Sequence, residues 1–267
     1  MTAGLRYLPT MATADLPRAK IVRYAVALRE GGSVPAIVEA DTGDTLIAKW
    51  RGAGQGAAVL VAEVIVGELA RAVGLNMPQL SVLDLDVAIA KTERDQEIRD
   101  ILLASLGPNL GMTYLDGALA FDPAADMPLP ANMVETLVLF DAFVMNVDRT
   151  ARNTNLLWWR DGLWLIDHGA AMYWHHGWDG TVENPERKFP LVKDHVLLPR
   201  AADFANAEAI LRERLTPEAI EAAVARVPSA WLTEGADARR AAYIDFLVRR
   251  TAALGSLREE AERARGV

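Results

Sequence analysis

Two aspartates and one asparagine stand beside a short apolar hairpin in the middle of the chain. Asp148 and Asn153 come just before this hairpin, whose predicted strands are 155–159 and 163–167, and Asp167 ends the second strand. An Asp-Gly pair joins the strands, and glycine accepts the positive φ of a tight turn. Because short strands bring their ends together, the three side chains can meet at one point. Two carboxylates and an amide form an all-oxygen ligand set that suits Mg²⁺ between protein and phosphate oxygens. The pattern therefore predicts a phosphoryl-transfer site.

The spacing of these residues follows that of protein-kinase-like catalytic loops. Such loops place a base Asp five residues before a metal-binding Asn, and a second metal-binding Asp follows the next hairpin. Here Asp148 stands five residues before Asn153, and Asp167 opens an Asp-His-Gly sequence. Taken alone, the spacing also suits a plain loop in which Asp148 pairs with Arg149 or Arg152. The hairpin and the second aspartate favour the catalytic interpretation.

The composition is that of a globular protein with a large core. The chain has 267 residues, of which 51% are hydrophobic and 24% are charged, which suits one domain of two lobes or two small domains. A net charge of −8 provides no basic field that would attract nucleic acid or an anionic membrane. Cysteine is absent, which excludes disulfides, thiolate metal sites and a cysteine nucleophile. We expect no direct binding of nucleic acid.

The sequence contains neither a signal-peptide pattern in its first seventeen residues nor an apolar run typical of a membrane span. Residues 1–17 lack both a cationic start and a continuous apolar core, so we expect an irregular lead-in rather than a signal peptide. Acidic residues interrupt the longest apolar runs, so none reaches the roughly 18 residues that a membrane span requires. We therefore expect a cytoplasmic protein without a membrane partner.

A three-stranded β-meander is predicted between residues 19 and 50. Alternation of apolar residues marks the first strand, and residues 34–40 and 45–50 form the second and third strands. The apolar face of the first strand comprises Val22, Tyr24, Val26 and Leu28, and that of the third comprises Leu46, Ala48 and Trp50. Ile47 and Lys49 lie on the opposite face of the third strand.

A glycine-rich turn and a lysine occupy two informative places on this meander. Gly31, Gly32 and Ser33 lie in the first turn, and Lys49 lies at the end of the third strand. In kinases such a turn covers the phosphates, and a strand lysine reaches them from the sheet. The sequence LIAK is similar to the strand motif V-A-I-K. Each feature alone is common in ordinary hairpins, but their order along the chain favours phosphate binding.

A long apolar helix, 57–73, follows a glycine-rich loop at 52–56. Apolar side chains lie almost all round the helix, so we expect it to be buried against the sheet. A kinase-like site needs a carboxylate here to hold Lys49 in place, and Glu63 and Glu68 are the two candidates. The loop lacks the Lys-Ser/Thr of a P-loop, so we interpret it as structural.

The remaining segments connect and support these parts. The pattern predicts strands at 80–86 and 111–115, helices at 95–105 and 132–146, a proline-containing loop at 121–130, and helices through most of 203–265 with Thr216-Pro217 as one helix start. Three histidines, His168, His175 and His176, have no acidic residue at ligand spacing, which favours a structural or substrate-facing role over a metal site.

The ordered set of residues resembles the HipA-like branch of the protein-kinase and phosphatidylinositol-kinase-like superfamily. The set comprises Gly31-Gly32, Lys49, Glu63, Asp148, Asn153 and Asp167, and the resemblance extends over about residues 22–202. It implies an α+β, bilobal protein-kinase-like fold: a small antiparallel-sheet N-lobe with one main helix (18–110), a hinge (111–120) and a larger, mostly helical C-lobe (121–267).

The resemblance also implies a role for each residue of the site. Gly31, Gly32 and Ser33 would cover the phosphates of ATP, and Lys49, held by Glu63, would bind these phosphates. Tyr114 and Leu115 in the hinge would meet the adenine edge. Asn153 and Asp167 would hold Mg²⁺, and Asp148 would act as the base. The resemblance favours Glu63 as the partner of Lys49 and leaves Glu68 in solvent.

The implied activity is ATP- and Mg²⁺-dependent transfer of the γ-phosphate to a hydroxyl acceptor, with a serine or threonine of a protein as the first choice. A pseudokinase that only binds nucleotide and a nucleotidyltransferase on the same fold are the alternatives. The chain departs from the family pattern at Thr150, where a histidine is usual, and at the Asp-His-Gly sequence, where Asp-Phe-Gly or Asp-Phe-Asp is usual. The acceptor therefore stays open among a protein, a small alcohol and a lipid. The intact set of Asp148, Asn153 and Asp167 favours catalysis, because a binding module needs no base.

Overall fold

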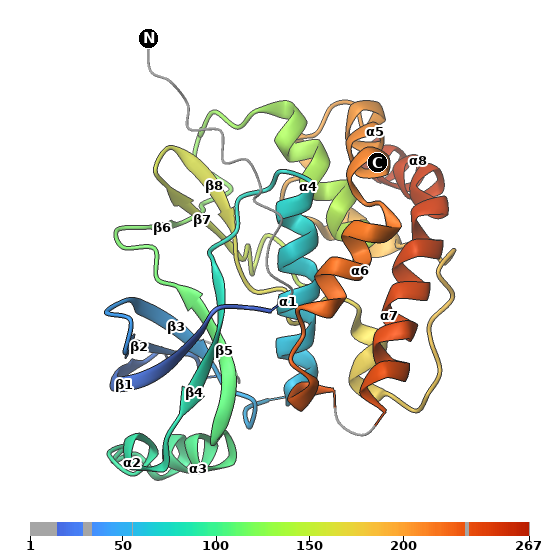
Figure 1. Cartoon of the computed structure of the whole chain (residues 1–267). Coiled ribbons are helices and arrows are strands. Elements are labelled where there is room, and N and C mark those ends of the chain that lie inside the picture. Colours follow the sequence, from blue (N-terminus) through green and yellow to red (C-terminus); the bar gives the residue numbers. More distant parts are fainter. Residues whose placement is uncertain (1–14, 29–33, 55, 233–234, 267) are drawn as a thin grey trace.

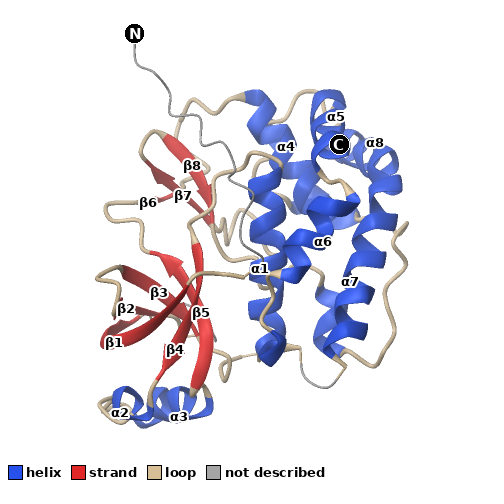
Figure 2. Ribbon diagram, viewed as in Figure 1, coloured by secondary structure: helices blue, strands red, loops and turns tan. Residues whose placement is uncertain are grey.

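The computed structural model describes residues 15–28, 34–54, 56–232 and 235–266. Gly31, Gly32 and Ser33, expected to cover the phosphates, lie outside these residues. Strands gather on one side of the molecule and most helices on the other, as Figures 1 and 2 show. The strands are β1 (Arg18–Ala27), β2 (Ala36–Ala40), β3 (Thr45–Lys49), β4 (Leu80–Leu85), β5 (Gly107–Thr113), β6 (Leu119–Ala120), β7 (Leu156–Trp159) and β8 (Gly162–Leu165).

The helices are concentrated in the second half of the chain. The α-helices are α1 (Ala57–Ala72), α2 (Val87–Ala90), α3 (Gln96–Ala104), α4 (Ala131–Phe143), α5 (Ala205–Arg214), α6 (Pro217–Ala225), α7 (Ala236–Arg250) and α8 (Leu254–Arg265). Short 3₁₀ helices are η1 (Tyr173–Gly177), η2 (Pro190–Asp194), η3 (Leu198–Arg200), η4 (Ser229–Trp231) and η5 (Thr251–Ala253). Within the described parts of the chain, no helix is long and apolar enough to cross a membrane.

The first five strands close into a barrel in the order β1-β2-β3-β5-β4. β1 pairs antiparallel with β2 but parallel with β4, so the prediction of a purely antiparallel sheet is wrong at this pairing. Closure leaves no free strand edge between β1 and β4. Helices α2 and α3, of which the sequence predicted only α3, contribute Ala90, Ile98 and Leu102 to the barrel core. β5 begins at Gly107, four residues before the prediction, and ends before Tyr114.

Strand β1 does not present the face that its alternation predicts. Val22 and Val26 are 52% and 49% exposed, whereas Ile21 is buried. The β1–β2 register shifts between Ile21 and Arg23 and again between Tyr24 and Val26. Each irregularity adds a residue to one strand, which reverses the inward and outward sides beyond it. Strand β3 is regular, and its predicted apolar face lies in the barrel core.

Helix α1 lies between the barrel and the other helices (Figure 1). It shares one core with residues of β4 and β5 on one side and with residues of α4 and α6 on the other. This explains why apolar side chains lie almost all round it. Glu68 is not in solvent as expected, because its side chain is 12% exposed and pairs with Arg226, the residue directly after α6, at 2.8 Å. The pair fixes α1 to the helical part of the molecule.

The predicted hairpin is formed by β7 and β8, and β6, which was not predicted, pairs with β7. The positive φ values fall on Arg160 (47°) and Asp161 (59°) rather than on Gly162, because Gly162 already pairs with Trp159 in the ladder. Gly162 serves a different purpose. A Cβ at this position would lie 3.2 Å from the side-chain nitrogen of Asn76, so its absence lets the hairpin approach the loop before β4.

Arg250 of α7 is fully buried and joins α7 to two distant segments. Its guanidinium donates to the carbonyls of Ala142 and Phe143 at the end of α4, at 2.9 and 2.6 Å. It also donates to the carbonyls of Pro185 and Arg187, at 2.8 and 2.9 Å. The last carbonyls of a helix lack partners within the helix and attract a cation. Burial lowers the pKa of Arg250 to about 10, which keeps the guanidinium charged at neutral pH.

We expect Arg250→Met to destabilise the fold strongly. Methionine fills similar space but removes the buried guanidinium that donates to four carbonyls, which lowers the free energy of unfolding by about 3–5 kcal/mol. Arg249→Met is the matched control, because the Arg249 side chain is exposed and pairs with the equally exposed Asp245; its effect should be below about 0.5 kcal/mol. Denaturant unfolding followed by circular dichroism measures both. Equal effects of the two substitutions would show that Arg250 does not anchor α7.

Candidate active site

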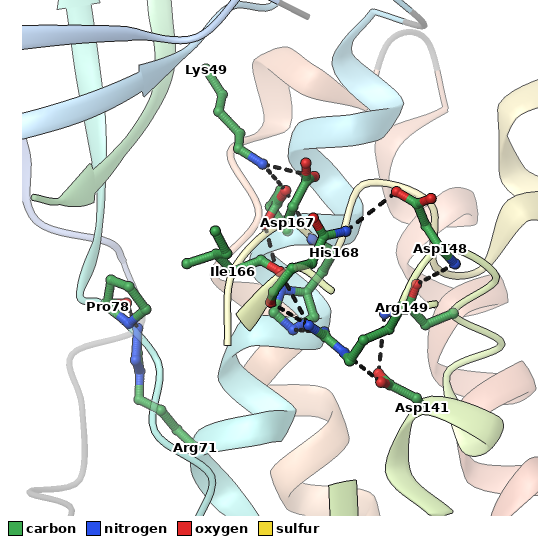
Figure 3. A network of polar contacts seen from close by, with 12 residues as sticks. Lys49, Arg71, Pro78, Asp141, Asp148, Arg149, Ile166, Asp167 and His168 are labelled. Atoms are coloured by element: carbon green, nitrogen blue, oxygen red, sulfur yellow. Dashed lines mark hydrogen bonds and ion pairs between the residues drawn. The ribbon is translucent and has the colours of Figure 1, made fainter. Parts of the chain in front are cut away.

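Lys49, Glu63 and Asp167 come from β3, from α1 and from the segment after β8, and they meet at one point. The Lys49 ammonium forms an ion pair with Glu63 Oε1 and lies 2.9 Å from Asp167 Oδ1, as Figure 3 shows for Lys49 and Asp167. Lys49 therefore pairs with Glu63 and not with Glu68. It is 8% exposed and Glu63 is fully buried, so Lys49 is not an ordinary surface lysine.

The surroundings keep this pair ionised. Burial alone would lower the pKa of Lys49, but the carboxylates of Glu63 and Asp167 outweigh burial and raise it above its usual value. Burial alone would raise the pKa of Glu63, but the ammonium of Lys49 and the hydrogen bond from His168 hold it well below its usual range. Two buried charges are stable only when each has well-placed partners. Lys49 is thus held as a cation with a fixed direction.

The sequence Asp167-His168-Gly169 adopts a backbone that few residues accept. Asp167 has a φ of 55°, in the left-handed region that costs a non-glycine residue about 1–2 kcal/mol. Such strain gathers at functional sites, where surrounding contacts maintain it. A Cβ at Gly169 would lie 2.6 Å from Val59 Cγ1 of α1, so only glycine permits this approach. The Asp167 side chain is 45% exposed and is available to a ligand.

Asp148 is half-buried and surrounded by amide groups. Its Oδ2 accepts hydrogen bonds from Asn153 Nδ2 at 2.7 Å and from Asn155 Nδ2 at 3.3 Å. Its backbone N–H donates to Asn146 Oδ1 at 3.2 Å. Burial raises the pKa of Asp148, and the charge of Asp167 adds to the rise, although the two amide bonds oppose it. A carboxylate with a raised pKa accepts a proton more readily.

The other amide atom of Asn153 determines whether a metal fits. Because Asn153 Nδ2 donates to Asp148, the side-chain oxygen Oδ1 of Asn153 is left for another ligand. This oxygen and the Asp167 carboxylate are the hard donors that Mg²⁺ accepts, and Mg²⁺ usually takes few protein ligands beside phosphates and water. No group of three or more His, Cys, Asp or Glu that could hold a metal occurs in the described ranges. The site therefore suits a metal shared with phosphate oxygens.

A buried ionic network that the sequence did not reveal holds the loop around Asp148. Arg149 Nε donates to Asp141 Oδ2 at 2.5 Å, and His195 Nε2 lies 2.9 Å from the same oxygen. Burial alone would raise the pKa of Asp141, but Arg149 and His195 lower it well below its usual range. Arg149 thus pairs with Asp141 and not with Asp148, against the plain-loop interpretation. Asp141 interrupts an apolar helix, which signals a buried partner, but the sequence does not identify it.

The backbone around Arg149 is fixed as well. Val196 N donates to the carbonyl of Arg149 at 3.0 Å, and Thr150 forms an antiparallel bridge with His195. Arg149 Nη1 donates to the carbonyl of Asn155 at 2.5 Å, which ties the loop to the start of the hairpin. The residue after Asp148 is therefore immobilised through both its backbone and its side chain.

The residues expected to meet adenine lie directly after β5. Tyr114 is 37% exposed and Leu115 is buried. Tyr114 N donates to the carbonyl of Thr45 at 3.2 Å. Trp159 Nε1 donates to the carbonyl of Asp116 at 2.8 Å, so the hairpin supports this connection. The contact of Tyr114 and Leu115 with a base stays a prediction.

Two of the remaining histidines have protein partners. His175 Nδ1 lies 2.9 Å from the hydroxyl of Tyr243, and His176 Nε2 lies 3.1 Å from the carbonyl of Gly169. The sequence favoured a structural or substrate-facing role for these histidines, and these contacts do not decide between the two. The glycine-rich loop is also anchored, because Gly52 N donates to Ser105 Oγ at 2.9 Å.

Solved structures with a similar fold are kinases. The Helicobacter pylori proinflammatory kinase CtkA has a TM-score of 0.59 and 9% identity, covering 90% of this chain and 96% of that protein. The Golgi casein kinase with Mn and ADP bound has a TM-score of 0.52 and 12% identity, covering 96% of this chain and 75% of the other. A second structure of the Golgi casein kinase gives the same TM-score and identity, with 96% and 76% covered. At these identities the likeness shows a kinase-like fold alone.

No curated protein sequence matches the chain. A protein-family model described as HipA-like kinase matches residues 21–254. That range contains β1 from Ile21 onward, the contact of Lys49 with Glu63 and Asp167, and the loop from Asp148 to Asn153. Because the match spans most of the chain, this protein belongs to the HipA-like kinase family.

Proposed function

We propose that this protein is an ATP- and Mg²⁺-dependent kinase that transfers the γ-phosphate to a hydroxyl acceptor, a serine or threonine of a protein. The observation that carries the proposal is the placement of a buried, charged Lys49 against Asp167. Asp167 in turn lies close enough to Asp148 for its charge to raise the pKa of Asp148. Cation, metal ligand and base are the parts that phosphoryl transfer needs. A module that only bound nucleotide would have no use for the base.

The residues of the barrel and of α1 would bind the nucleotide. Lys49, aimed by Glu63, would contact the α- and β-phosphates. The turn with Gly31, Gly32 and Ser33 would cover them. Tyr114 and Leu115 would meet the adenine edge in a hinge at 111–120, between an N-lobe at 18–110 and a C-lobe at 121–267. In this arrangement the fixed ammonium needs no reorganisation when the phosphates arrive.

The metal would be held by Asn153 and Asp167. When bound, Mg²⁺ supplies positive charge beside the phosphate oxygens. Asp148 would face the acceptor, orient its hydroxyl and accept the proton on a carboxylate oxygen. Asn153 and Asn155 hold that carboxylate through Oδ2, so Oδ1 is the oxygen that would receive the proton.

Labelled ATP distinguishes this proposal from its alternatives. The purified protein is incubated with Mg²⁺, a panel of acceptors and ATP carrying a label on the α- or the γ-phosphate. Transfer of the γ-label to a protein hydroxyl supports the kinase. Transfer of the α-label would replace it with a nucleotidyltransferase. Binding of ATP without transfer of either label would replace it with a pseudokinase.

We expect Asp148→Asn to separate binding from transfer. Asparagine keeps the shape of the side chain but cannot accept the proton, so transfer should fall by roughly 10²–10⁴-fold. The affinity for Mg²⁺·ATP should stay within a few-fold, because the carboxylate faces the acceptor. Calorimetric titration and a transfer assay on folded protein measure the two quantities. A variant that transfers at the wild-type rate would exclude Asp148 as the base.

We expect Asp167→Asn to abolish Mg²⁺-dependent binding of nucleotide. The substitution removes a negative charge that a metal between protein and phosphates requires. Asp161→Asn is the matched control, because Asp161 is exposed in the hairpin turn and asparagine tolerates its positive φ. Calorimetry with ATP in the presence and absence of Mg²⁺ compares the variants. Unchanged Mg²⁺·ATP affinity in Asp167→Asn would refute the metal assignment.

We expect Lys49→Met to lower both transfer and stability. The substitution leaves the buried Glu63 carboxylate without its cation, which costs about 3–5 kcal/mol. Adding Glu63→Gln removes the unpaired charge and should restore part of the stability but no transfer. Denaturant unfolding and the transfer assay measure the single and double variants. If the double variant is no more stable than Lys49→Met, the two side chains do not act as a pair.

A further inference from the structure

His168 is fully buried between the two charged parts of the site. It stands in the middle of the Asp-His-Gly sequence, and its backbone N–H donates to Glu63 Oε1 at 3.0 Å. Its imidazole lies between Glu63 and Arg149. Nδ1 is 3.6 Å from Glu63 Oε2, and Nε2 is 3.2 Å from Arg149 Nη2. Figure 3 shows His168 between Asp167 and Arg149.

The neighbours of the imidazole determine where its proton lies. A guanidinium can only donate hydrogen bonds, so His168 Nε2 accepts from Arg149 and carries no proton. The proton therefore lies on Nδ1, on the side of Glu63. Both His168 Nδ1 and Glu63 Oε2 are buried, and neither has a hydrogen-bond partner among the residues that the structure describes. Their separation of 3.6 Å is too long for a hydrogen bond. The interaction is therefore between the N–H dipole and the charge of the carboxylate.

We propose that His168 is a positioning residue that couples the Lys49–Glu63 pair to the Arg149–Asp141 pair. This inference rests on the proposed function, in which Lys49 binds phosphates and Asp148 is the base. Through Glu63, His168 determines the direction of the Lys49 ammonium. Through Arg149, it supports the loop that carries Asp148. One imidazole ring thus joins the phosphate-binding and the proton-accepting sides of the site.

Glu63 is the contact at which this coupling matters most. Lys49 has two carboxylate partners, and one of them, Asp167, is also the proposed metal ligand. Glu63 is the partner without a second role, so its orientation decides where the ammonium points. Lys49 and the His168 backbone both contact Oε1, whereas the His168 ring faces Oε2. A phenylalanine ring would fill the space, but it would leave Glu63 Oε2 without a dipole and would remove the His168 nitrogen that Arg149 Nη2 contacts.

The proton position is tested without any nucleotide. The chain has four histidines, so the ring nitrogens can be resolved by ¹⁵N NMR, and His168→Gln assigns its signals by their loss. We expect His168 to carry its proton on Nδ1. His195 serves as an internal reference, because its proton should lie on the other ring nitrogen. Its Nδ1 accepts from Leu197 N at 3.1 Å, so its proton lies on Nε2, toward Asp141. A proton on Nε2 of His168 overturns the inference.

The coupling is tested by substitution and by a double-mutant cycle. We expect His168→Phe to remain folded and to lower kcat by roughly 10- to 100-fold through misalignment, with KM for ATP changed far less. His168→Gln, which offers both an N–H and an oxygen, should recover most of the loss. His175→Phe is the matched control, because it removes a buried imidazole whose contact is with Tyr243 of α7 and not with the Asp-His-Gly sequence, and it should keep kcat within about two-fold.

The cycle combines His168→Phe with Glu63→Gln. If His168 acts through Glu63, His168→Phe should cost little further in the Glu63→Gln background. Equal losses in both backgrounds, or a wild-type kcat in His168→Phe, overturn the inference. Absence of transfer in the wild type overturns the proposed function instead, and the imidazole spectrum then still decides where His168 directs its proton.

Discussion

The ion pair between Lys49 and Glu63 is the interaction on which the site depends. Each charge has left water, so each needs partners that offset the loss of hydration. The pair therefore requires β3 to end at one place, α1 to pass at one distance, and the backbone of His168 to point an N–H at Glu63. Close packing of apolar side chains around α1 meets the second requirement, because it leaves the helix no room to shift.

The helical part of the molecule supports the same arrangement from the other side. Glu68 and Arg226 join α1 to α6, and Trp231 Nε1 donates to the carbonyl of Pro108 in β5 at 3.0 Å. The barrel and α1 are thus both attached to the segment from α6 to η4. The lysine, its glutamate and the loop of Asp148 are held in their relative positions by contacts within the protein, which is the preorganisation that the proposed catalysis requires.

The sequence predicted those features that local patterns encode. The β7–β8 hairpin follows from alternation and a turn, α1 from its apolar length, and the cap of α6 from Thr216, whose hydroxyl accepts from Ala219 N. The family followed from the order and spacing of a few polar residues. Closure of the barrel through the parallel β1–β4 pairing could not be predicted, because it depends on contacts between distant segments. The same holds for the bulges of β1 that expose Val22 and Val26.

The charged network around Arg149 shows the same limit within the site. Asp141 lies in a helix, His168 in a loop and His195 directly after η2, and nothing in their spacing indicates that they meet. A buried acid or histidine signals that a partner exists, but only the fold determines which one it is. The partners of the two buried arginines, Arg149 and Arg250, could not be predicted either. Arg149 pairs with a carboxylate, whereas Arg250 donates to four backbone carbonyls.

The bonds of Arg250 have a consequence for synthesis of the protein. Helix α4 leads directly into the loop of Asp148, and the carbonyls at its end wait for a guanidinium that lies about a hundred residues further along the chain. On the ribosome, the segment from Ala142 to Asp167 therefore emerges long before its anchor does. The end of α4, which leads into the loop of Asp148, therefore gains the guanidinium of Arg250 only after α7 has left the exit tunnel.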